Sequence, residues 1–273
     1  MTIDVRAVDS LDDPELEPYR TMRWQAEHRQ RRIFVAEGEK VVRRLLESGW
    51  AVVSLLLPEK WWREYEPLVR RRRPAPRVFT AEKAVLERLT GFSMYQGVLA
   101  VGRVPEPEPL ETWLGRWPRP RFLAAIEGLS NAENVGVVVR NCGAFGVHGL
   151  VVGETCASAY LRRAVRSSMG VIFRQPVLEV QSLVEAIGQL RRQGIRCLGA
   201  HPHADDRLLS ATDLTGDSCL VFGSEGEGLS GPVQTACDGL VSVPMAAGID
   251  SLNVASASAV FFYEARRQRE WAA

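Results

Sequence analysis

The chain has 273 residues, of which 46% are hydrophobic and 25% are charged, the balance of a folded globular protein. This length favours two domains, with cores large enough to need no disulfide or metal. No apolar run approaches the roughly 18 residues of a membrane span, so no membrane partner is expected. The net charge of +1 does not by itself indicate a nucleic-acid partner.

The five cysteines are scattered, odd in number and form no C-x-x-C pair: Cys142, Cys156, Cys197, Cys219 and Cys237. That spacing argues against a zinc knuckle or a redox dithiol, and most of them are expected to be small buried hydrophobic residues. The first 20 residues are acidic and lack the basic-then-apolar order of a secretory signal. A reducing, cytoplasmic location is therefore expected.

The amino-terminal part, residues 20–103, alternates helix-like and strand-like segments. Residues 33–49 (IFVAEGEKVVRRLLESG) carry apolar side chains at helical spacing, whereas 51–57 (AVVSLLL) and 95–104 (YQGVLAVGRV) are apolar enough for strands. A small α/β/α sandwich is expected. Arginines are concentrated between Arg29 and Arg44, and the run from Arg70 to Arg73 is expected to be a solvated charged face.

Residues 104–120 (VPEPEPLETWLGRWPRP) are rich in proline, which fixes the backbone and removes hydrogen-bond donors. This segment is predicted to be a semi-rigid linker between the amino-terminal part and a carboxy-terminal part of residues 121–273.

The carboxy-terminal part contains five apolar strand candidates, at 122–128, 149–153, 196–200, 219–223 and 239–244. Helical stretches lie between them, notably 182–193, and a last helix is expected from about Asn253 to Arg267. Strands that are apolar along their whole length are usually covered on both faces, which predicts a mostly parallel α/β sheet.

Three polar loops follow these strands, at the edge where open α/β sheets bind ligands. In the first, 127–147, Ser130 or Asn131 is expected to cap a helix that opens near Asn134. Arg140 follows three valines, so it needs either a partner or a cleft. An ordinary structural pair with a carboxylate explains it equally well.

The second loop, 220–232 (LVFGSEGEGLSGP), is rich in glycine but matches neither a P-loop nor the dinucleotide-binding fingerprint, and a plain turn also explains it. The third, 243–267, opens a helix of small residues, for which close packing is an alternative explanation. His201, His203 and Asp205 suggest metal ligands, but the segment is short and has no further ligand cluster, so no metal is expected.

In this order the three loops resemble the three motifs of the SpoU/TrmH-type RNA 2′-O-ribose methyltransferases. The first motif is carried by Asn134, Gly136, Arg140, Phe145 and Gly146. The second is carried by Gly223, Glu225, Gly226, Gly228 and Leu229, and the third by Pro244, Met245, Ser251, Leu252 and Asn253. The likeness covers residues 121–268. It departs from the family at Asn131-Ala132, where members often carry Asp-Pro.

The resemblance implies a trefoil knot at the carboxy end of the parallel sheet, and a homodimer. Through HRQRRIFVAEGEKVV and YQGVLAV, the amino-terminal part also resembles the substrate-binding domain of longer members, which is similar to a small ribosomal-protein fold. That likeness implies that residues 20–103 bind RNA, and it favours ribosomal RNA over transfer RNA.

The resemblance further implies S-adenosylmethionine as cofactor and methylation of a ribose 2′-hydroxyl in structured RNA. The implied catalytic residues are Asn134, Arg140, Glu225, Ser251 and Asn253. The implied cofactor contacts are Ala200, Gly223, Val243, Met245 and Leu252. Because guanidinium stays protonated in proteins, Arg140 is expected to clamp phosphate and stabilise charge rather than act as a simple base. Glu225 is expected to hold Arg140 in a bidentate pair.

Two rival interpretations remain at this point. A non-enzymatic RNA-binding protein on the same fold would grip RNA with the arginine-rich amino-terminal part. A nucleotide-dependent enzyme of the doubly wound type is disfavoured because the phosphate-binding fingerprint is missing.

Overall fold

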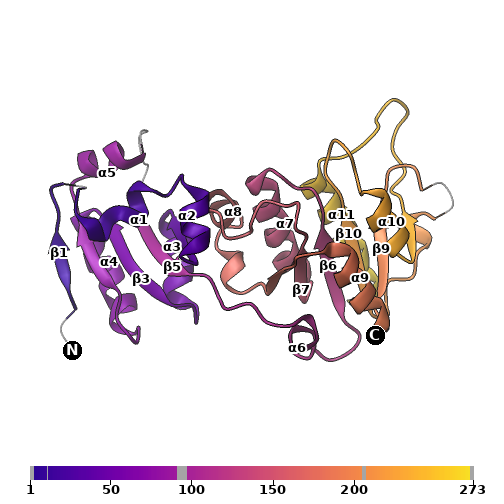
Figure 1. Cartoon of the computed structure of the whole chain (residues 1–273), viewed down its shortest axis with the longest axis horizontal. Coiled ribbons are helices and arrows are strands. Elements are labelled where there is room, and N and C mark those ends of the chain that lie inside the picture. Colours follow the sequence, from indigo (N-terminus) through magenta and orange to yellow (C-terminus); the bar gives the residue numbers. More distant parts are fainter. Residues whose placement is uncertain (1–2, 11, 91–96, 205–206, 271–273) are drawn as a thin grey trace. The chain divides into compact units, whose positions relative to one another are not determined.

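The structure is a computed structural model, and it describes residues 3–10, 12–90, 97–204 and 207–270 (Figure 1). The chain divides into two compact units. Unit 1 comprises residues 1–106 and 160–174, and unit 2 comprises residues 107–159 and 175–273. No helix among the described residues is long and apolar enough to span a membrane.

Unit 1 is built on a five-stranded mixed sheet in the order β1-β4-β3-β5-β2. Its strands are β1 (Val5–Ala7), β2 (Ile33–Glu37), β3 (Val52–Leu57), β4 (Arg77–Thr80) and β5 (Leu99–Arg103). Its helices are α1 (Glu17–Arg20), α2 (Gln25–Gln30), α3 (Glu39–Glu47), α4 (Glu59–Arg70), α5 (Lys83–Thr90) and α8 (Arg162–Ser167), with short 3-10 turns at Pro14–Leu16 and Val171–Phe173. The expected small α/β/α sandwich is confirmed.

The helical interpretation of residues 33–49 is only half right. Residues Ile33–Glu37 form strand β2, which is buried along its whole length, and helix α3 begins only at Glu39. Gly38, with φ of +98°, makes the turn between them. The apolar spacing that indicated a helix belongs to α3 alone, through Val41, Val42, Leu45 and Leu46.

The arginine run at 70–73 is not uniformly solvated. Arg72 is half-buried, and its guanidinium donates to the backbone carbonyl of Leu46 in the last turn of α3 and to those of Ser48 and Trp50 just beyond it. A helix leaves its last carbonyls without partners, and Arg72 satisfies them. Arg70, Arg71 and Arg73 are exposed, as predicted for a charged face.

The segment from Tyr160 to Arg174 lies in unit 1, although the sequence prediction kept it with the rest of 121–273. Arg162 and Arg166 both pair with Glu37, a carboxylate only 6% exposed at the end of β2. Phe173 packs its ring against Phe34, with the ring centroids 5.6 Å apart. Because a buried carboxylate needs compensating charge, the two arginines secure this segment to β2.

His28 provides a pH prediction for unit 1. Its side chain is 7% exposed, and its Nε2 lies 3.0 Å from Oγ1 of Thr21. Burial, and next the positive charge of Arg31, lower the pKa of His28 below its usual value. The unfolded chain therefore binds the proton more readily than the folded chain does. The contribution of His28 is complete above about pH 6.5 and is lost as the pH falls from that value through the lower pKa of the folded chain.

We expect the free energy of unfolding, measured with urea, to decrease from pH 7.5 to pH 5.5. His28→Gln should reduce that decrease, because glutamine does not titrate. An unchanged pH dependence in the variant would show that other groups cause it.

Unit 2 is built on a six-stranded sheet in the order β11-β9-β10-β6-β7-β8, and every neighbouring pair is parallel. Its strands are β6 (Phe122–Ile126), β7 (Gly149–Val152), β8 (Val177–Glu179), β9 (Arg196–Ala200), β10 (Ser218–Phe222) and β11 (Gly239–Val241). Its helices are α6 (Leu110–Leu114), α7 (Ala132–Phe145), α9 (Leu183–Arg192), α10 (Gly231–Ala236) and α11 (Val254–Glu270), with a 3-10 turn at Leu209–Ala211.

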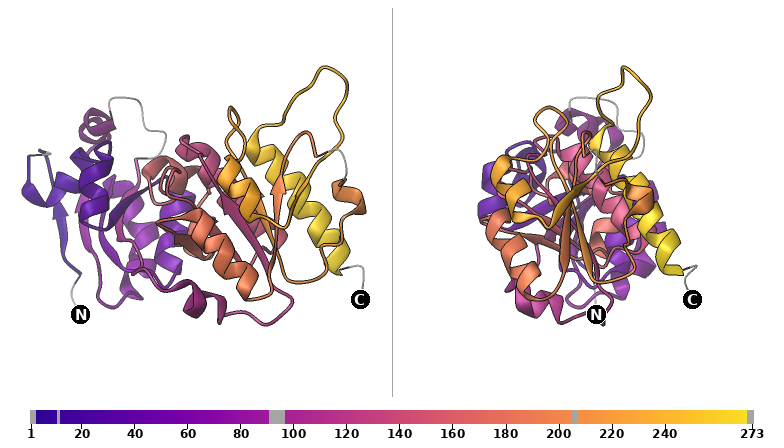
Figure 2. Two further views of the ribbon diagram at one scale, coloured as in Figure 1. Left: turned by 45° about the vertical axis from the view of Figure 1, so that its right-hand side comes forward. Right: turned by 90° about the vertical axis from the view of Figure 1, so that its right-hand side faces the viewer.

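Helices cover both faces of this sheet (Figure 2, right). On one face, α6, α9 and α10 share a hydrophobic core with alternate strand residues such as Leu123 and Val221. On the other, α11 packs its Phe262 edge-on against Phe122 and Phe222, and α7 packs beside α11. The prediction of a mostly parallel α/β sheet is confirmed, and all five predicted strands are present.

Strand β8 was not predicted, because it has three residues of which only Leu178 is buried, and it therefore forms no apolar run. The proline-rich segment 104–120 is also more than a connection, because Leu110, Trp113 and Leu114 of α6 are part of the core of unit 2. Threading of the chain is not defined by strand order, so the trefoil knot stays a prediction.

The cysteines lie where small hydrophobic residues would. Cys142, Cys197, Cys219 and Cys237 are buried, and Cys156 is half-buried. Burial raises the pKa of the Cys156 thiol to about 11, which leaves it a poor nucleophile at neutral pH.

Candidate functional site

The three polar loops meet at one edge of the unit 2 sheet. They follow β6, β10 and β11, and β9 and β10 lie between β11 and β6 in the strand order. In a parallel sheet the carboxyl ends of all strands share one edge, where ligands bind. The site is therefore assembled from residues more than 100 positions apart in the sequence.

The first loop leads into α7 through a conventional N-cap. Oδ1 of Asn131 accepts a 2.9 Å hydrogen bond from the backbone N–H of Glu133, so α7 begins at Ala132, two residues earlier than predicted. The departure at Asn131 therefore keeps the cap oxygen that an Asp would supply at this position. Asn134 consequently lies in the first turn of α7, at the edge of the sheet.

A single carboxylate joins the three motifs. Nδ2 of Asn134 donates a 2.8 Å hydrogen bond to Oε1 of Glu225, and Nδ2 of Asn253 donates to the same oxygen. The amides of Asn253 and Asn134 are themselves 3.5 Å apart, Nδ2 to Oδ1. Oδ1 of Asn253 also accepts from the backbone N–H of Ala255 and caps α11. We call Asn134, Glu225 and Asn253 the amide–carboxylate group.

The predicted pair between Glu225 and Arg140 is wrong. Arg140 lies on the exposed side of α7, and its guanidinium has neither a hydrogen bond nor an ion pair within the described part of the chain. A helix turns 100° per residue, so Val138 and Val139 can be buried while the next side chain faces solvent. Apolar neighbours in sequence were therefore poor evidence that Arg140 is buried.

Asn141, the next residue of α7, has a role that its sequence context did not predict. Its Nδ2 donates to the carbonyl of Ala255 at 2.7 Å and to Oγ of the fully buried Ser258 at 2.9 Å. These bonds hold the α7 backbone that carries Arg140 against the start of α11. The sequence signal that could have identified Asn141 was its position next to Cys142, a cysteine that was expected to be buried.

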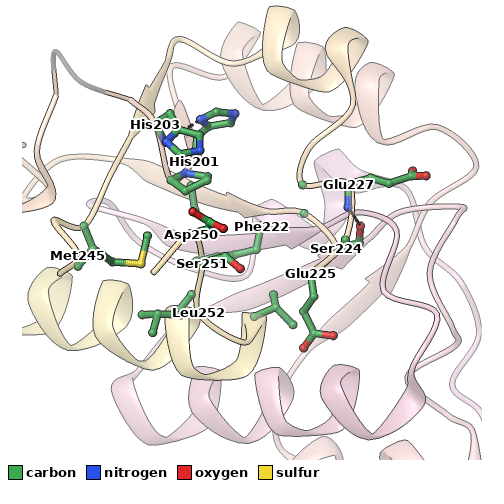
Figure 3. A pocket seen from close by; sticks show the side chains of 18 of the residues that line it. His201, His203, Phe222, Ser224, Glu225, Glu227, Met245, Asp250, Ser251 and Leu252 are labelled. Atoms are coloured by element: carbon green, nitrogen blue, oxygen red, sulfur yellow. Dashed lines mark hydrogen bonds between the residues drawn. The ribbon is translucent and has the colours of Figure 1, made fainter. Parts of the chain in front are cut away.

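Beside the amide–carboxylate group lies a pocket of about 430 Å³ (Figure 3). Its lining includes all five residues predicted to contact the cofactor, namely Ala200, Gly223, Val243, Met245 and Leu252. Glu225 and Ser251 line it as well, whereas Asn134, Arg140 and Asn253 do not belong to its lining. Glu225 is thus shared between the pocket and the amide–carboxylate group.

The glycine-rich loop is a tight turn that forms one wall of the pocket. Ser224 and Gly228 exchange two backbone hydrogen bonds of 3.1 and 3.0 Å. The turn folds back over Gly223, where a Cβ atom would lie 2.1 Å from the carbonyl carbon of Gly228. Only glycine permits this approach, so the plain-turn and ligand-binding interpretations describe the same feature.

The charges around the pocket define what it can hold. Its lining includes three acidic residues, Glu225, Glu227 and Asp250, and two histidines, but neither lysine nor arginine. Such a lining opposes a polyphosphate and suits a ligand with a cationic centre. It therefore argues against the nucleotide-dependent enzyme. The described residues contain no cluster of three or more metal-ligand side chains, and Asp205 lies outside them.

Comparison with known proteins gives a consistent result. The model of the "SpoU rRNA Methylase family" matches residues 121–263. A Mycobacterium tuberculosis protein named as an uncharacterized tRNA/rRNA methyltransferase is 33% identical, with 97% of this chain and 93% of the relative covered. A Synechocystis protein of the same designation is 28% identical over 100% of this chain and 97% of the relative.

Solved structures of the same family share the whole architecture. The SpoU methyltransferase AviRb from Streptomyces viridochromogenes superimposes with a TM-score of 0.81 at 30% identity, over 95% of this chain and 99% of that one. Its complex with AdoMet gives a TM-score of 0.80 at 29% identity, over 94% and 98% of the two chains. The family match, these relatives and the site geometry agree that the chain belongs to the SpoU family of RNA methyltransferases.

Proposed function

We propose that this protein transfers the methyl group of S-adenosylmethionine to a ribose 2′-hydroxyl of a structured RNA, with ribosomal RNA as the favoured class. The observation that carries the proposal is the acidic pocket joined through Glu225 to Asn134 and Asn253. S-adenosylmethionine is the methyl donor of this family, and its sulfonium and ammonium suit a lining that contains acidic residues and neither lysine nor arginine.

The finer specificity is supported by one further likeness. A solved structure described as an RNA 2′-O ribose methyltransferase matches with a TM-score of 0.77 at 25% identity, over 97% of this chain and 98% of that one. A homodimer in the cytoplasm, with a knotted carboxy end, completes the proposal.

The cofactor supplies an already activated methyl group, so the chain's own residues need only to position the ribose oxygen and manage its proton. Arg140 has no described protein partner, which leaves its guanidinium available to an RNA phosphate. Its positive charge then stabilises the charge that develops on the ribose oxygen, and an RNA phosphate accepts the proton. Asn134 and Asn253, both held by Glu225, orient the RNA at this corner.

The direct test is methylation of RNA from a strain that lacks the gene. The purified chain and S-adenosylmethionine are expected to produce 2′-O-methylated nucleosides, which nuclease digestion and mass spectrometry identify. Mapping the modified position then names the RNA. A methylated base, or RNA binding without any S-adenosylmethionine binding in calorimetry, would contradict the proposal and, in the second case, favour the non-enzymatic RNA-binding protein.

We assign the RNA-binding surface to unit 1. Residues 20–32 (RTMRWQAEHRQRR) contain five arginines and one glutamate, and within them the side chain of Trp24 is 65% exposed. The Arg29 side chain is exposed and, within the described chain, has no partner. Guanidinium groups bind phosphate, and an exposed indole offers a surface on which an unpaired base can stack.

Trp24→Ala is therefore expected to weaken RNA binding by about 5- to 150-fold, the loss of one stacked base. Trp24→Phe should retain most of the affinity, and S-adenosylmethionine binding should not change. Val53→Ala, which removes another exposed apolar side chain of unit 1, is the matched control. Equal RNA affinity of Trp24→Ala and the wild type, measured by filter binding, would remove Trp24 from the RNA surface.

A further inference from the structure

The imidazole of His201 lines the pocket in a fixed orientation that neither the motifs nor the predicted cofactor contacts include. His201 directly follows β9, the strand between β11 and β10. Its backbone N–H donates to the carbonyl of Val241 at 3.0 Å, which ties it to the end of β11. Further along the loop, the carbonyl of Ala204 accepts from Oγ of the buried Ser242 at 2.9 Å. The loop is thus held to β11 at two points.

The ring itself is also held. The backbone N–H of His203 donates a 3.1 Å hydrogen bond to Nδ1 of His201, and the two rings meet edge to face, with centroids 6.0 Å apart. A ring nitrogen that accepts a hydrogen bond carries no proton, so the proton of the neutral ring lies on Nε2. His201 therefore presents a single, oriented N–H donor from a ring that lines the pocket.

The chemistry of the lining limits what this donor can meet. Asp250, whose carboxylate lies among the lining side chains in Figure 3, and the negative charge of Glu225 oppose a carboxylate in the pocket, so an uncharged acceptor is favoured over the amino-acid carboxylate of the cofactor. Figure 3 shows His201 and Glu225 on opposite sides of the pocket. Since Glu225 belongs to the amide–carboxylate group where the RNA is placed, His201 faces the end away from it.

We infer that His201 recognises the nucleoside part of S-adenosylmethionine, with its Nε2–H donating to an adenine nitrogen or a ribose oxygen. Adenine and ribose offer several uncharged acceptors, and the apolar side chains of Val243, Met245 and Leu252 in the same lining suit a flat base. Asp250, also in the lining, is a carboxylate of the kind that proteins place against ribose hydroxyls. His201 thereby adds a side-chain contact to a pocket predicted from backbone and apolar contacts.

The test compares two variants of nearly equal shape in the full chain. His201→Gln keeps an N–H donor at the end of the side chain, whereas His201→Met has the same length and no donor. Calorimetry without RNA measures the dissociation constants of S-adenosylmethionine and of 5′-methylthioadenosine, which retains adenine and ribose but lacks the amino acid. Because no RNA is present, failure of the ribose-methylation proposal does not affect this result.

His201→Met is expected to weaken both ligands equally, by about 3- to 15-fold, the effect of one hydrogen bond. His201→Gln should remain within about threefold of the wild type. Val184→Ala, which removes an exposed side chain of α9 outside the pocket lining, serves as the control, with little change expected. Unchanged binding by His201→Met would overturn the inference, as would a loss confined to S-adenosylmethionine, which would place His201 against the amino-acid part. Thermal unfolding of each variant confirms that it is folded.

Discussion

Replacing Arg140 with Ala is expected to lower kcat for methyl transfer by about 10²- to 10³-fold, while the affinity for S-adenosylmethionine stays within about twofold. The reason is that Arg140 does not line the cofactor pocket and forms no bond with the amide–carboxylate group. Its charge is needed only once RNA is present, as charge develops on the ribose oxygen. Multiple-turnover methylation at saturating RNA with radiolabelled cofactor, and calorimetry without RNA, measure the two quantities.

Arg192→Ala is the matched control for this experiment. Arg192 is an exposed arginine of α9, which covers the opposite face of the sheet from α7, and its side chain has no partner among the described residues. Its loss should leave turnover unchanged. Turnover by Arg140→Ala close to the wild-type rate would eliminate the proposed role, and a parallel loss of cofactor affinity would make Arg140 a structural residue instead.

The second large effect concerns the glycine-rich turn. Gly223→Ala should reduce S-adenosylmethionine affinity at least about 100-fold, because the new Cβ would lie 2.1 to 2.3 Å from backbone atoms of Gly228 and Leu229. These atoms are all backbone, so no flexible side chain can move aside and the wall of the pocket must open. The expected readouts are cofactor titration by calorimetry and a lowered Tm.

Gly226→Ala offers an internal comparison three residues away in the same loop. A Cβ on Gly226 meets nothing within 4 Å, and Gly226 is not among the residues of positive φ. Its substitution should leave affinity and Tm nearly unchanged. If both alanine variants bound the cofactor like the wild type, the close approach over Gly223 would not be a requirement of the pocket.

Interactions between residues close together in the sequence could be predicted, whereas those between distant residues could not. Apolar strands and the caps Asn131 and Asn253 are local features, since a cap lies within two residues of the N–H that it accepts from. The five predicted cofactor contacts lie together because parallel strands end at one edge. The partners of Glu225 could not be derived in the same way. A guanidinium and two amides were all chemically suitable, and the packing of α7 against α11 decides which of them reach it.

The same limit explains the errors over Arg140 and Arg72. A run of valines before Arg140 suggested burial, but exposure on a helix depends on angle rather than on neighbours in sequence. Arg72 was one of four adjacent arginines and was distinguishable from the others only by the carbonyls near the end of α3, more than 20 residues earlier.

Because residues 160–174 belong to unit 1, a single cut in the chain cannot separate the two units of this protein. The chain changes unit three times, after residues 106, 159 and 174, so neither unit is an uninterrupted stretch of the gene. A fragment that ended at Glu106 would retain the buried carboxylate of Glu37 but lose both of its arginines. A fragment that began at Pro107 would carry Ile172 and Phe173 without the unit that buries them. The two units cannot be exchanged by simple fusion of gene segments. Any fusion must therefore keep the unit proposed to bind RNA together with the unit that holds the cofactor pocket.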